Sequence, residues 1–231
     1  MKAVIILVIA AIVFVIAVMW SGVPTAYLRI RNKFRHKGRA GDRELCLTFD
    51  DGPSAEYTPR LLDLLKRYDV KATFFVVAKF AEENPDIIER MLDEGHCIGL
   101  HSYDHKFQMT MGLGKTKRDY DSADQVMRKL GLRPKYYRAP WGTVNVASLD
   151  SVRDRAYKLV FWDVMVGDWS AKTTVTQIIE RLQKKTRSGD IICLHDGRGS
   201  DGAPGRTIEA LGTMIPYWKK HGYRFVAIPE K

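Results

Sequence analysis

The sequence contains little cysteine, with three residues in a chain of 231: Cys46, Cys97 and Cys193. All three lie in apolar, strand-like runs, and no recurring spacing relates them. An odd number of cysteines without a spacing pattern excludes a disulfide framework. We therefore expect three buried free thiols, which suit a reducing compartment, although burial would protect them elsewhere too.

The chain also lacks internal repeats, low-complexity tracts and any sign of a second domain. Its length is enough for one large domain with a proper core. One stretch, Gly112-Leu113-Gly114-Lys115-Thr116, ends like a phosphate-binding loop. However, Met109 stands where that motif requires a glycine six residues before the lysine, so we discard it.

Most of the chain has almost as many acidic as basic residues, although the formal net charge is +10. Residues 1–44 hold eight lysines and arginines against Asp42 and Glu44, which gives +6. The other 187 residues carry 29 basic and 25 acidic side chains, a net charge of only +4. The positive charge belongs mainly to the N-terminal segment, so we expect no nucleic-acid partner.

One long apolar run is present, Ala3–Trp20, with eighteen residues and no glycine, proline or charge. This is long for the core of a signal peptide and close to the minimum for spanning a bilayer. The stretch from Ser21 to Ala26 offers only a poor cleavage site. We predict a transmembrane signal anchor at 1–20, a basic linker at 21–43 and one body domain at 44–231, with a cleaved signal peptide as the alternative.

The basic linker bears on the orientation in the membrane. Seven basic residues lie between Arg29 and Arg43, against Lys2 and the amino terminus on the other flank of the apolar run. The positive-inside rule then places the body in the cytoplasm.

Strand-like runs alternate with helical patterns from residue 44 onward. The predicted strands are Glu44–Asp50, Ala72–Val77, Cys97–His101, Tyr136–Ala139, Leu159–Val164, Ile191–His195 and Tyr223–Ile228. The predicted helices are Thr58–Tyr68, Asn84–Glu94, Lys117–Leu130, Thr174–Arg187 and Thr207–His221, and residues 145–155 are ambiguous. Seven strands with intervening helices favour an α/β fold, a single-domain parallel barrel rather than an open sheet.

Polar side chains gather at the C-terminal ends of these strands, where the active sites of parallel barrels lie. Asp50 and Asp51 end the first strand, and His101 and His105 follow the third. Two histidines four residues apart share one face of a helical turn, and with one carboxylate they form a metal set that leaves a position open for water. Two solvated loop histidines are the alternative.

Two adjacent carboxylates repel each other and are costly to bury without partners. A metal site removes this difficulty, because one carboxylate ligates the metal while its neighbour stays free as a base. The turn at Gly52-Pro53 lets both face the pocket. The metal lowers the pKa of water toward neutrality, and the free carboxylate can take the proton.

Five short motifs occur in order along the body. They are Thr48-Phe49-Asp50-Asp51-Gly52-Pro53, His101-Ser102-x-x-His105, Arg138-x-Pro140-Trp141-Gly142, Asp168-Trp169 and Ile191-Ile192-Cys193-Leu194-His195. Together they resemble the motifs of the NodB-type polysaccharide deacetylases, carbohydrate esterase family 4, over residues 44–228. The resemblance implies a distorted (β/α)7 barrel and one divalent metal ion, Zn²⁺ or a similar ion such as Co²⁺, that serves to hydrolyse N-acetyl groups of amino sugars.

The resemblance also implies a role for each matching residue. Asp50 resembles the general base, Arg138 the residue that orients it, and Asp51, His101 and His105 the metal ligands.

The remaining matches concern the reacting amide. Trp141 would donate its backbone N–H to the oxyanion. His195 resembles the general acid, which Asp168 keeps cationic by raising its pKa. Trp169 would wall the pocket for the acetyl methyl group.

Two positions depart from the family's pattern. Met165 stands where the family often has an aspartate, three residues before the Asp168-Trp169 pair, and the nearest acid is Asp163. Cys193 stands where a leucine is usual, two residues before His195. Neither departure removes a catalytic group. Both bear on the acyl pocket, so we count Cys193 with Trp141 and Trp169 as candidate substrate-binding residues.

The sequence thus predicts a metal-dependent hydrolase, held at the membrane, that removes N-acetyl groups from peptidoglycan or a related N-acetylglucosamine glycan. Two alternatives stay open: a deacetylase of a lipid-linked amino sugar at the inner leaflet, and a catalytically inactive glycan-binding relative. The expected partners are an N-acetylated glycan or glycolipid and the membrane, and a monomer is expected. The side of the membrane is open, because the resemblance favours the outside and the charge favours the inside.

Overall fold

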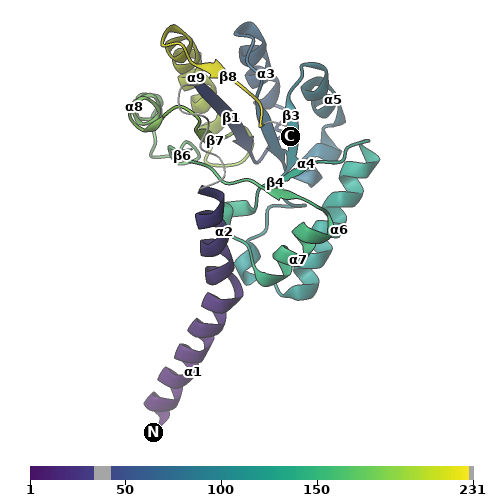
Figure 1. Ribbon diagram of the computed structural model, residues 1–231, viewed down its shortest axis with the longest axis vertical. Helices are drawn as coiled ribbons and strands as arrows, with labels where there is room; N and C mark the ends of the chain where they lie inside the picture. The colour runs from purple at the N-terminus through teal and green to yellow at the C-terminus, as the bar shows by residue number, and fades with distance from the viewer. Residues whose placement is uncertain (34–42, 229–231) are drawn as a thin grey trace.

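The computed structural model describes residues 1–33 and 43–228 (Figure 1). Residues 34–42, most of the second half of the predicted basic linker, lie outside the described residues, as do residues 229–231. The described chain consists of a long N-terminal helix and an α/β body from which that helix projects (Figure 1).

One parallel sheet organises the body. Its strands are β1 (Glu44–Asp50), β2 (Thr73–Val76), β3 (Cys97–Leu100), β4 (Tyr136–Tyr137), β5 (Lys158–Leu159), β6 (Val164–Met165), β7 (Ile191–His195) and β8 (Arg224–Phe225). The order is β5-β4-β3-β2-β1-β7-β6, and β8 pairs with the start of β1. Within the described residues β5 and β6 do not pair, so the barrel is open on that side. The predicted distorted (β/α)7 fold is confirmed.

The prediction of one strand at Leu159–Val164 is wrong. This segment forms two short strands on opposite edges of the sheet, β5 beside β4 and β6 beside β7. The buried Arg138 guanidinium accounts for the break, because it donates to the carbonyl oxygens of Val160 and Phe161 at 3.3 Å each. Carbonyl groups that accept from a side chain are taken out of the strand ladder.

Helices cover the sheet. In the body they are α3 (Thr58–Arg67), α4 (Ala78–Glu83), α5 (Pro85–Asp93), α6 (Leu113–Lys129), α7 (Val146–Asp154), α8 (Val175–Lys185) and α9 (Ala203–Lys220). The ambiguous segment forms α7, whose first turn is stabilised by a reciprocal cap between Asn145 and Ser148. Helix α9 begins at Ala203, four residues earlier than predicted.

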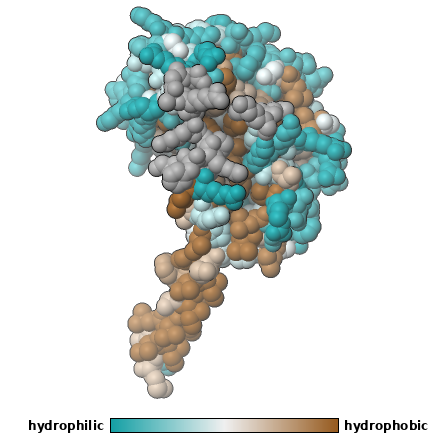
Figure 2. Space-filling view, viewed as in Figure 1, coloured by the Kyte–Doolittle hydropathy of each residue, from teal (hydrophilic) through white to brown (hydrophobic). Residues whose placement is uncertain are grey.

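The N-terminal apolar run is helical, and the helix continues beyond it. α1 (Lys2–Ala17) passes through a π-helical turn (Val18–Gly22) into α2 (Val23–Lys33). No side chain of α1 is buried, and the apolar surface of this helix stands clear of the body in Figure 2. Its length and hydropathy fit a membrane span or a signal sequence. The first part of the predicted linker is therefore helical, because α2 packs on the body.

Strand β1 divides the large core from the barrel interior. Leu45, Leu47 and Phe49 belong to the large core under the helices. The alternate residue Cys46 packs against a small cluster inside the barrel, so Thr48 and Asp50 also point inward. The period-two alternation of a strand thus aims Asp50 at the interior.

The three cysteines differ from expectation in one respect. Cys193 is buried, but Cys46 and Cys97 are only partly so, and the described residues contain no disulfide. The expectation of buried thiols is therefore wrong for two of the three.

Candidate active site

The carboxyl ends of the parallel strands meet at one edge of the sheet, and the predicted site residues lie there. The backbone is strained at this edge, where four residues other than glycine have positive φ angles: Asp51 (76°), Ser102 (73°), His105 (60°) and Trp141 (53°). Such conformations cost free energy and cluster at functional sites. The strain therefore marks this edge as the functional end of the molecule.

Asp51, His101 and His105 form a compact, buried donor set. Nε2 of His101 and Nε2 of His105 lie 3.3 and 2.9 Å from Oδ1 of Asp51. Burial alone would raise the pKa of Asp51, but the two histidines hold it well below its usual range. The two imidazole rings lie 5.1 Å apart, and the indole of Trp141 packs edge-on against His105 at 4.4 Å.

The hydrogen bonds of this set fit a metal ion. Nδ1 of His101 lies 2.7 Å from the carbonyl oxygen of Arg138, which can only accept, so Nδ1 carries the proton and Nε2 presents its lone pair to Asp51. Oδ1 of Asp51 is buried with no hydrogen bond to any described residue. A buried carboxylate oxygen facing two ring nitrogens, with all three atoms within 4.8 Å of one another, is the arrangement that a divalent cation satisfies.

Asp50 is held from both sides. Its Oδ1 accepts from Nη1 of Arg138 at 2.7 Å, and its Oδ2 accepts from the thiol of Cys193 at 3.3 Å. The Arg138 guanidinium is fully buried, also donates to Oγ1 of Thr48, and stacks on the ring of Phe75. The buried cation stabilises the ionised carboxylate and fixes its orientation.

His195 is paired with a second buried carboxylate. Its Nδ1 lies 3.0 Å from Oδ1 of Asp168, whose Oδ2 accepts from the backbone N–H of His195 and from the hydroxyl of Thr207. Burial lowers the pKa of His195, but Asp168 outweighs it, and the pKa rises to about 9. The imidazole is therefore cationic at neutral pH, with Nε2–H as its remaining donor.

A second trio, Asp50, Cys193 and His195, is as compact as the first. Its electrostatics differ, because Asp50 already accepts two hydrogen bonds and His195 carries a proton. Burial and the nearby Asp50 raise the pKa of the Cys193 thiol well above its usual range. This trio suits proton transfer better than metal binding.

Two tryptophans flank the site. Trp141 is 52% exposed and Trp169 is 38% exposed, and Trp169 packs edge-on against the ring of His195 at 5.1 Å. The position of Trp169 fits the predicted wall of the acetyl pocket, and both tryptophans lie where a bound substrate could contact them.

Asp196 follows His195 directly, and from sequence it could equally be a helix-capping acid, a loop acid or a functional group. The residue is 1% exposed and accepts a 2.6 Å hydrogen bond from Thr58. Burial raises its pKa to about 7, since Thr58 only partly offsets the loss of solvation. Its carboxylate packs so closely on Gly52 that a Cβ there would lie 2.3 Å from Oδ2. Its place directly after a core strand is the only signal that the sequence offered.

Asp163 and Met165 mark a departure from the family's pattern. Neither side chain has a hydrogen bond or ion pair with the site residues Asp50, Asp51 or His195 among the contacts of the described residues. The carboxylate of Asp163 accepts a 2.9 Å hydrogen bond from the backbone N–H of Ile191, which ties the segment between β5 and β6 to β7. Met165 lies half-buried in β6. Asp163 is therefore a structural acid.

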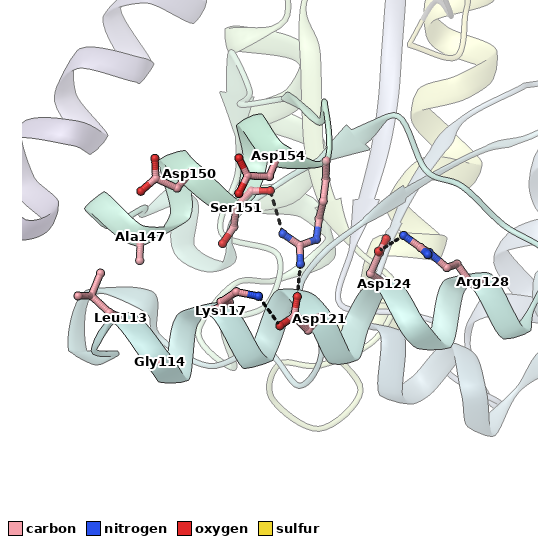
Figure 3. Close-up of a pocket in the computed structure, with 11 residues that line it drawn as sticks. Leu113, Gly114, Lys117, Asp121, Asp124, Arg128, Ala147, Asp150, Ser151 and Asp154 are labelled. Carbon is pink, nitrogen blue, oxygen red and sulfur yellow. Dashed lines mark hydrogen bonds and ion pairs between the residues drawn. The ribbon is translucent and has the colours of Figure 1, made fainter.

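The described surface contains grooves near the site and away from it. One of about 440 Å³ adjoins the site and is lined by Asp51, Phe80, Arg198 and neighbouring residues. Another, of about 620 Å³, lies between α6 and α7, away from the site (Figure 3). Its charged side chains pair with one another, as Lys117 and Asp121 do. The first groove is thus the natural extension of the candidate active site.

Comparisons with known proteins agree with this geometry. Residues 37–160 match the family model described as polysaccharide deacetylase. A peptidoglycan-N-acetylglucosamine deacetylase of Bacillus cereus is 36% identical over 191 residues, which cover 82% of this chain and 88% of the relative.

Solved structures agree as well. The Bc1960 peptidoglycan N-acetylglucosamine deacetylase superposes with a TM-score of 0.77 at 32% identity, over 83% of this chain and 89% of that one. A family 4 acetyl xylan esterase from Clostridium thermocellum, solved with a cobalt ion, superposes with a TM-score of 0.72 at 34% identity, over 80% of this chain and 88% of that one. With the fold, the order of the motifs and these matches in agreement, the chain belongs to the polysaccharide deacetylase family.

Proposed function

We propose that the protein is a membrane-anchored, metal-dependent deacetylase that removes N-acetyl groups from the N-acetylglucosamine units of peptidoglycan. One observation carries the proposal: a three-donor metal set, an arginine-held carboxylate and a carboxylate-held imidazole converge at one edge of the sheet. A module that only binds glycans needs neither proton-transfer pair. The names of the relatives support peptidoglycan as the substrate class.

Asp51, His101 and His105 would hold the metal ion. Two imidazole nitrogens and one carboxylate oxygen match the ligand sets of catalytic zinc sites. A related esterase was solved with a cobalt ion, which supports a divalent metal in this family. When bound, the ion supplies Lewis acidity that polarises the amide carbonyl and makes water a stronger acid.

Asp50 would act as the general base. It accepts the proton of the water molecule as the water oxygen bonds to the acetyl carbon. Arg138 fixes the orientation of the carboxylate before that step. The backbone N–H of Trp141 would donate to the oxygen of the former carbonyl as negative charge develops on it.

His195 would act as the general acid. As the carbon–nitrogen bond breaks, Nε2–H gives its proton to the departing amine, and acetate and a free amino sugar are released. Asp168 holds the ring through Nδ1, so Nε2 is the atom left to face the substrate. A pKa of about 9 means that the proton is in place at neutral pH.

Acetate release tests the activity directly. The full-length protein in detergent, loaded with Zn²⁺, should release acetate from purified peptidoglycan and from a soluble N-acetylglucosamine oligomer. A chelator should stop the release, and added Zn²⁺ should restore it. Binding of either glycan without acetate release would instead support the inactive glycan-binding relative.

We further propose that the N-terminal helix is a retained anchor. Ser21, immediately after the apolar run, is fully buried against the body, so the π-helical turn that leads into α2 is part of the folded protein. A cleavage within residues 21–26 would cut through this packed segment. Electrophoretic mass of the membrane-bound protein distinguishes a full-length chain from a processed one.

Peptidoglycan as substrate places the body on the outer side of the membrane. The seven basic residues between Arg29 and Arg43 favour the opposite orientation, with a lipid-linked amino sugar at the inner leaflet as the substrate. Protease added to intact cells separates the two. Digestion of the body supports the outer location, and protection until lysis supports the inner one.

A further inference from the structure

The helix that follows the membrane segment packs directly on the loop that carries Trp141. Oγ of Ser21 donates to the carbonyl oxygen of Val144 at 2.6 Å, and the hydroxyl of Thr25 exchanges hydrogen bonds with the carbonyl and N–H of Val144 at 3.1 and 3.0 Å. Leu28 packs against the large core. Three consecutive turns of one helix face therefore contact the body.

Arg29 continues this face onto the strained part of the loop. Its guanidinium lies 3.3 Å from the carbonyl oxygen of Trp141 and 3.2 Å from that of Gly142. These two residues have consecutive positive φ angles of 53° and 61°, a conformation that L-residues avoid. A guanidinium that donates to both carbonyl oxygens stabilises this shape.

Arg29 also contacts the aromatic residues that surround the base-orienting arginine. Its Cζ lies 5.7 Å from the ring of Phe161 and 5.4 Å from that of Trp162. Arg138 donates to the carbonyl of Phe161 and lies 5.8 Å from the ring of Trp162. The anchor helix and the arginine that holds Asp50 thus share two neighbours.

From these contacts we infer that α2 is a structural part of the active site, and that Arg29 is a positioning residue for the Trp141–Val144 loop. This inference rests on the proposed function, in which the backbone N–H of Trp141 meets the oxyanion. Among the described residues, Arg29 donates hydrogen bonds to the loop and not to any proposed catalytic side chain, so it acts through the placement of that N–H. The far end of the loop is held separately by the buried Asn145, which donates to the carbonyl oxygens of Gln108 and Met111.

The same docking places the pocket near the bilayer. Arg29 follows Trp20, the last residue of the apolar run, by nine residues, which corresponds to roughly 14 Å along a helix. The Trp141–Val144 loop contacts the helix at Arg29 itself, so no flexible linker separates the loop from the apolar run. The substrate is therefore glycan within a short distance of the membrane surface.

The test compares variants of the full-length protein in detergent. Arg29→Ala removes the contacts, Arg29→Lys keeps the charge, and Arg31→Ala is the matched control, because Arg31 is an exposed arginine of the same helix. We expect kcat to fall about 10- to 100-fold in Arg29→Ala with KM within about twofold, since a misplaced donor weakens the transition state more than substrate binding. Arg29→Lys should recover part of the loss, and Arg31→Ala should match the natural protein.

Hydrogen exchange supplies a readout that does not depend on activity. The Val144 amide, which donates to Thr25, should exchange faster in Arg29→Ala than in Arg31→Ala, while the metal content stays equal. Equal kcat and equal exchange in the two variants would overturn the inference, as would a lower melting temperature with unchanged kcat. If the natural protein releases no acetate, the proposed function fails, and the exchange comparison still decides whether Arg29 holds the loop.

Discussion

Histidines lie at both edges of the sheet, and their pKa values shift in opposite directions at the two edges. At the carboxyl edge, His195 faces the fully buried Asp168 and its pKa rises to about 9. At the amino edge, just before β3, His96 is 1% exposed, and burial with the nearby Lys71 lowers its pKa to about 4. Burial alone favours the neutral ring at both places.

The partners of the two rings account for the difference. Nδ1 of His96 accepts from the backbone N–H of Ala72 at 3.2 Å, which requires an unprotonated nitrogen, and Glu94 is 3.8 Å away. Nδ1 of His195 instead faces a carboxylate that can only accept. The partner of Nδ1 therefore distinguishes the two rings. His96 accepts a hydrogen bond there and has a structural role, whereas His195 donates one and can hold a proton for transfer.

The largest loss of activity is expected when the two histidines of the metal-binding set are removed. His101→Ala combined with His105→Ala leaves Asp51 as the only donor of the set, so we expect loss of the bound ion and of measurable acetate release. Metal analysis of the purified full-length protein should give one ion per chain in the natural protein and none in the double variant. His96→Gln is the control at the opposite edge and should keep its ion. A double variant that retains stoichiometric metal would contradict this assignment.

The next effect concerns the base. Asp50→Asn keeps the shape of the side chain but cannot accept a proton, so kcat should fall about 10²- to 10⁴-fold. The metal content should remain that of the natural protein, because Asp50 is outside the donor set. Near-native acetate release by this variant would assign the base role to another group.

Much of this edge is predictable from sequence, because parallel strands end at the same side of a sheet. That rule alone brings together residues as far apart as Asp50 and His195, and it holds here. The pairs that set their chemistry, Arg138 with Asp50 and Asp168 with His195, were expected only through the family resemblance. The structure brings both pairs together at hydrogen-bonding distance.

What the sequence did not predict depends on contacts between distant segments. The division of the Leu159–Val164 run follows from the guanidinium of Arg138, which donates to the carbonyl oxygens of Val160 and Phe161, 22 and 23 residues later. The helical fold of the supposed linker follows from the packing of Ser21 and Arg29 on a loop more than a hundred residues later. Local periodicity contains no information about either contact.

A smaller effect, visible mainly in the pH profile, is expected from Asp168→Asn. Without the carboxylate, burial is left to lower the pKa of His195, so the alkaline limb of kcat should move from near pH 9 to below neutrality. The pairing also stabilises the fold: because the folded-state pKa is raised, this contribution is complete below about pH 6.5 and is lost as the pH rises through about 9. Asp201→Asn, an exposed acid on the neighbouring loop, is the control. An unmoved alkaline limb in Asp168→Asn would assign that limb to a different group.

The smallest effect on activity is expected at the amino edge, where His96→Gln should leave kcat unchanged at neutral pH and alter only the acid stability. Because the folded-state pKa of His96 is depressed, its neutral form stabilises the protein above about pH 6.5, and this contribution is lost as the pH falls toward 4. Between pH 7 and pH 5 the natural protein should lose about 2 kcal/mol of stability through this group. Glutamine keeps an amide oxygen to accept from Ala72 but does not titrate, so the loss should be smaller by that amount. Urea unfolding of the full-length protein at the two pH values measures the difference. An equal loss in both proteins would mean that His96 does not resist protonation, and the contrast between the two edges would then rest on His195 alone.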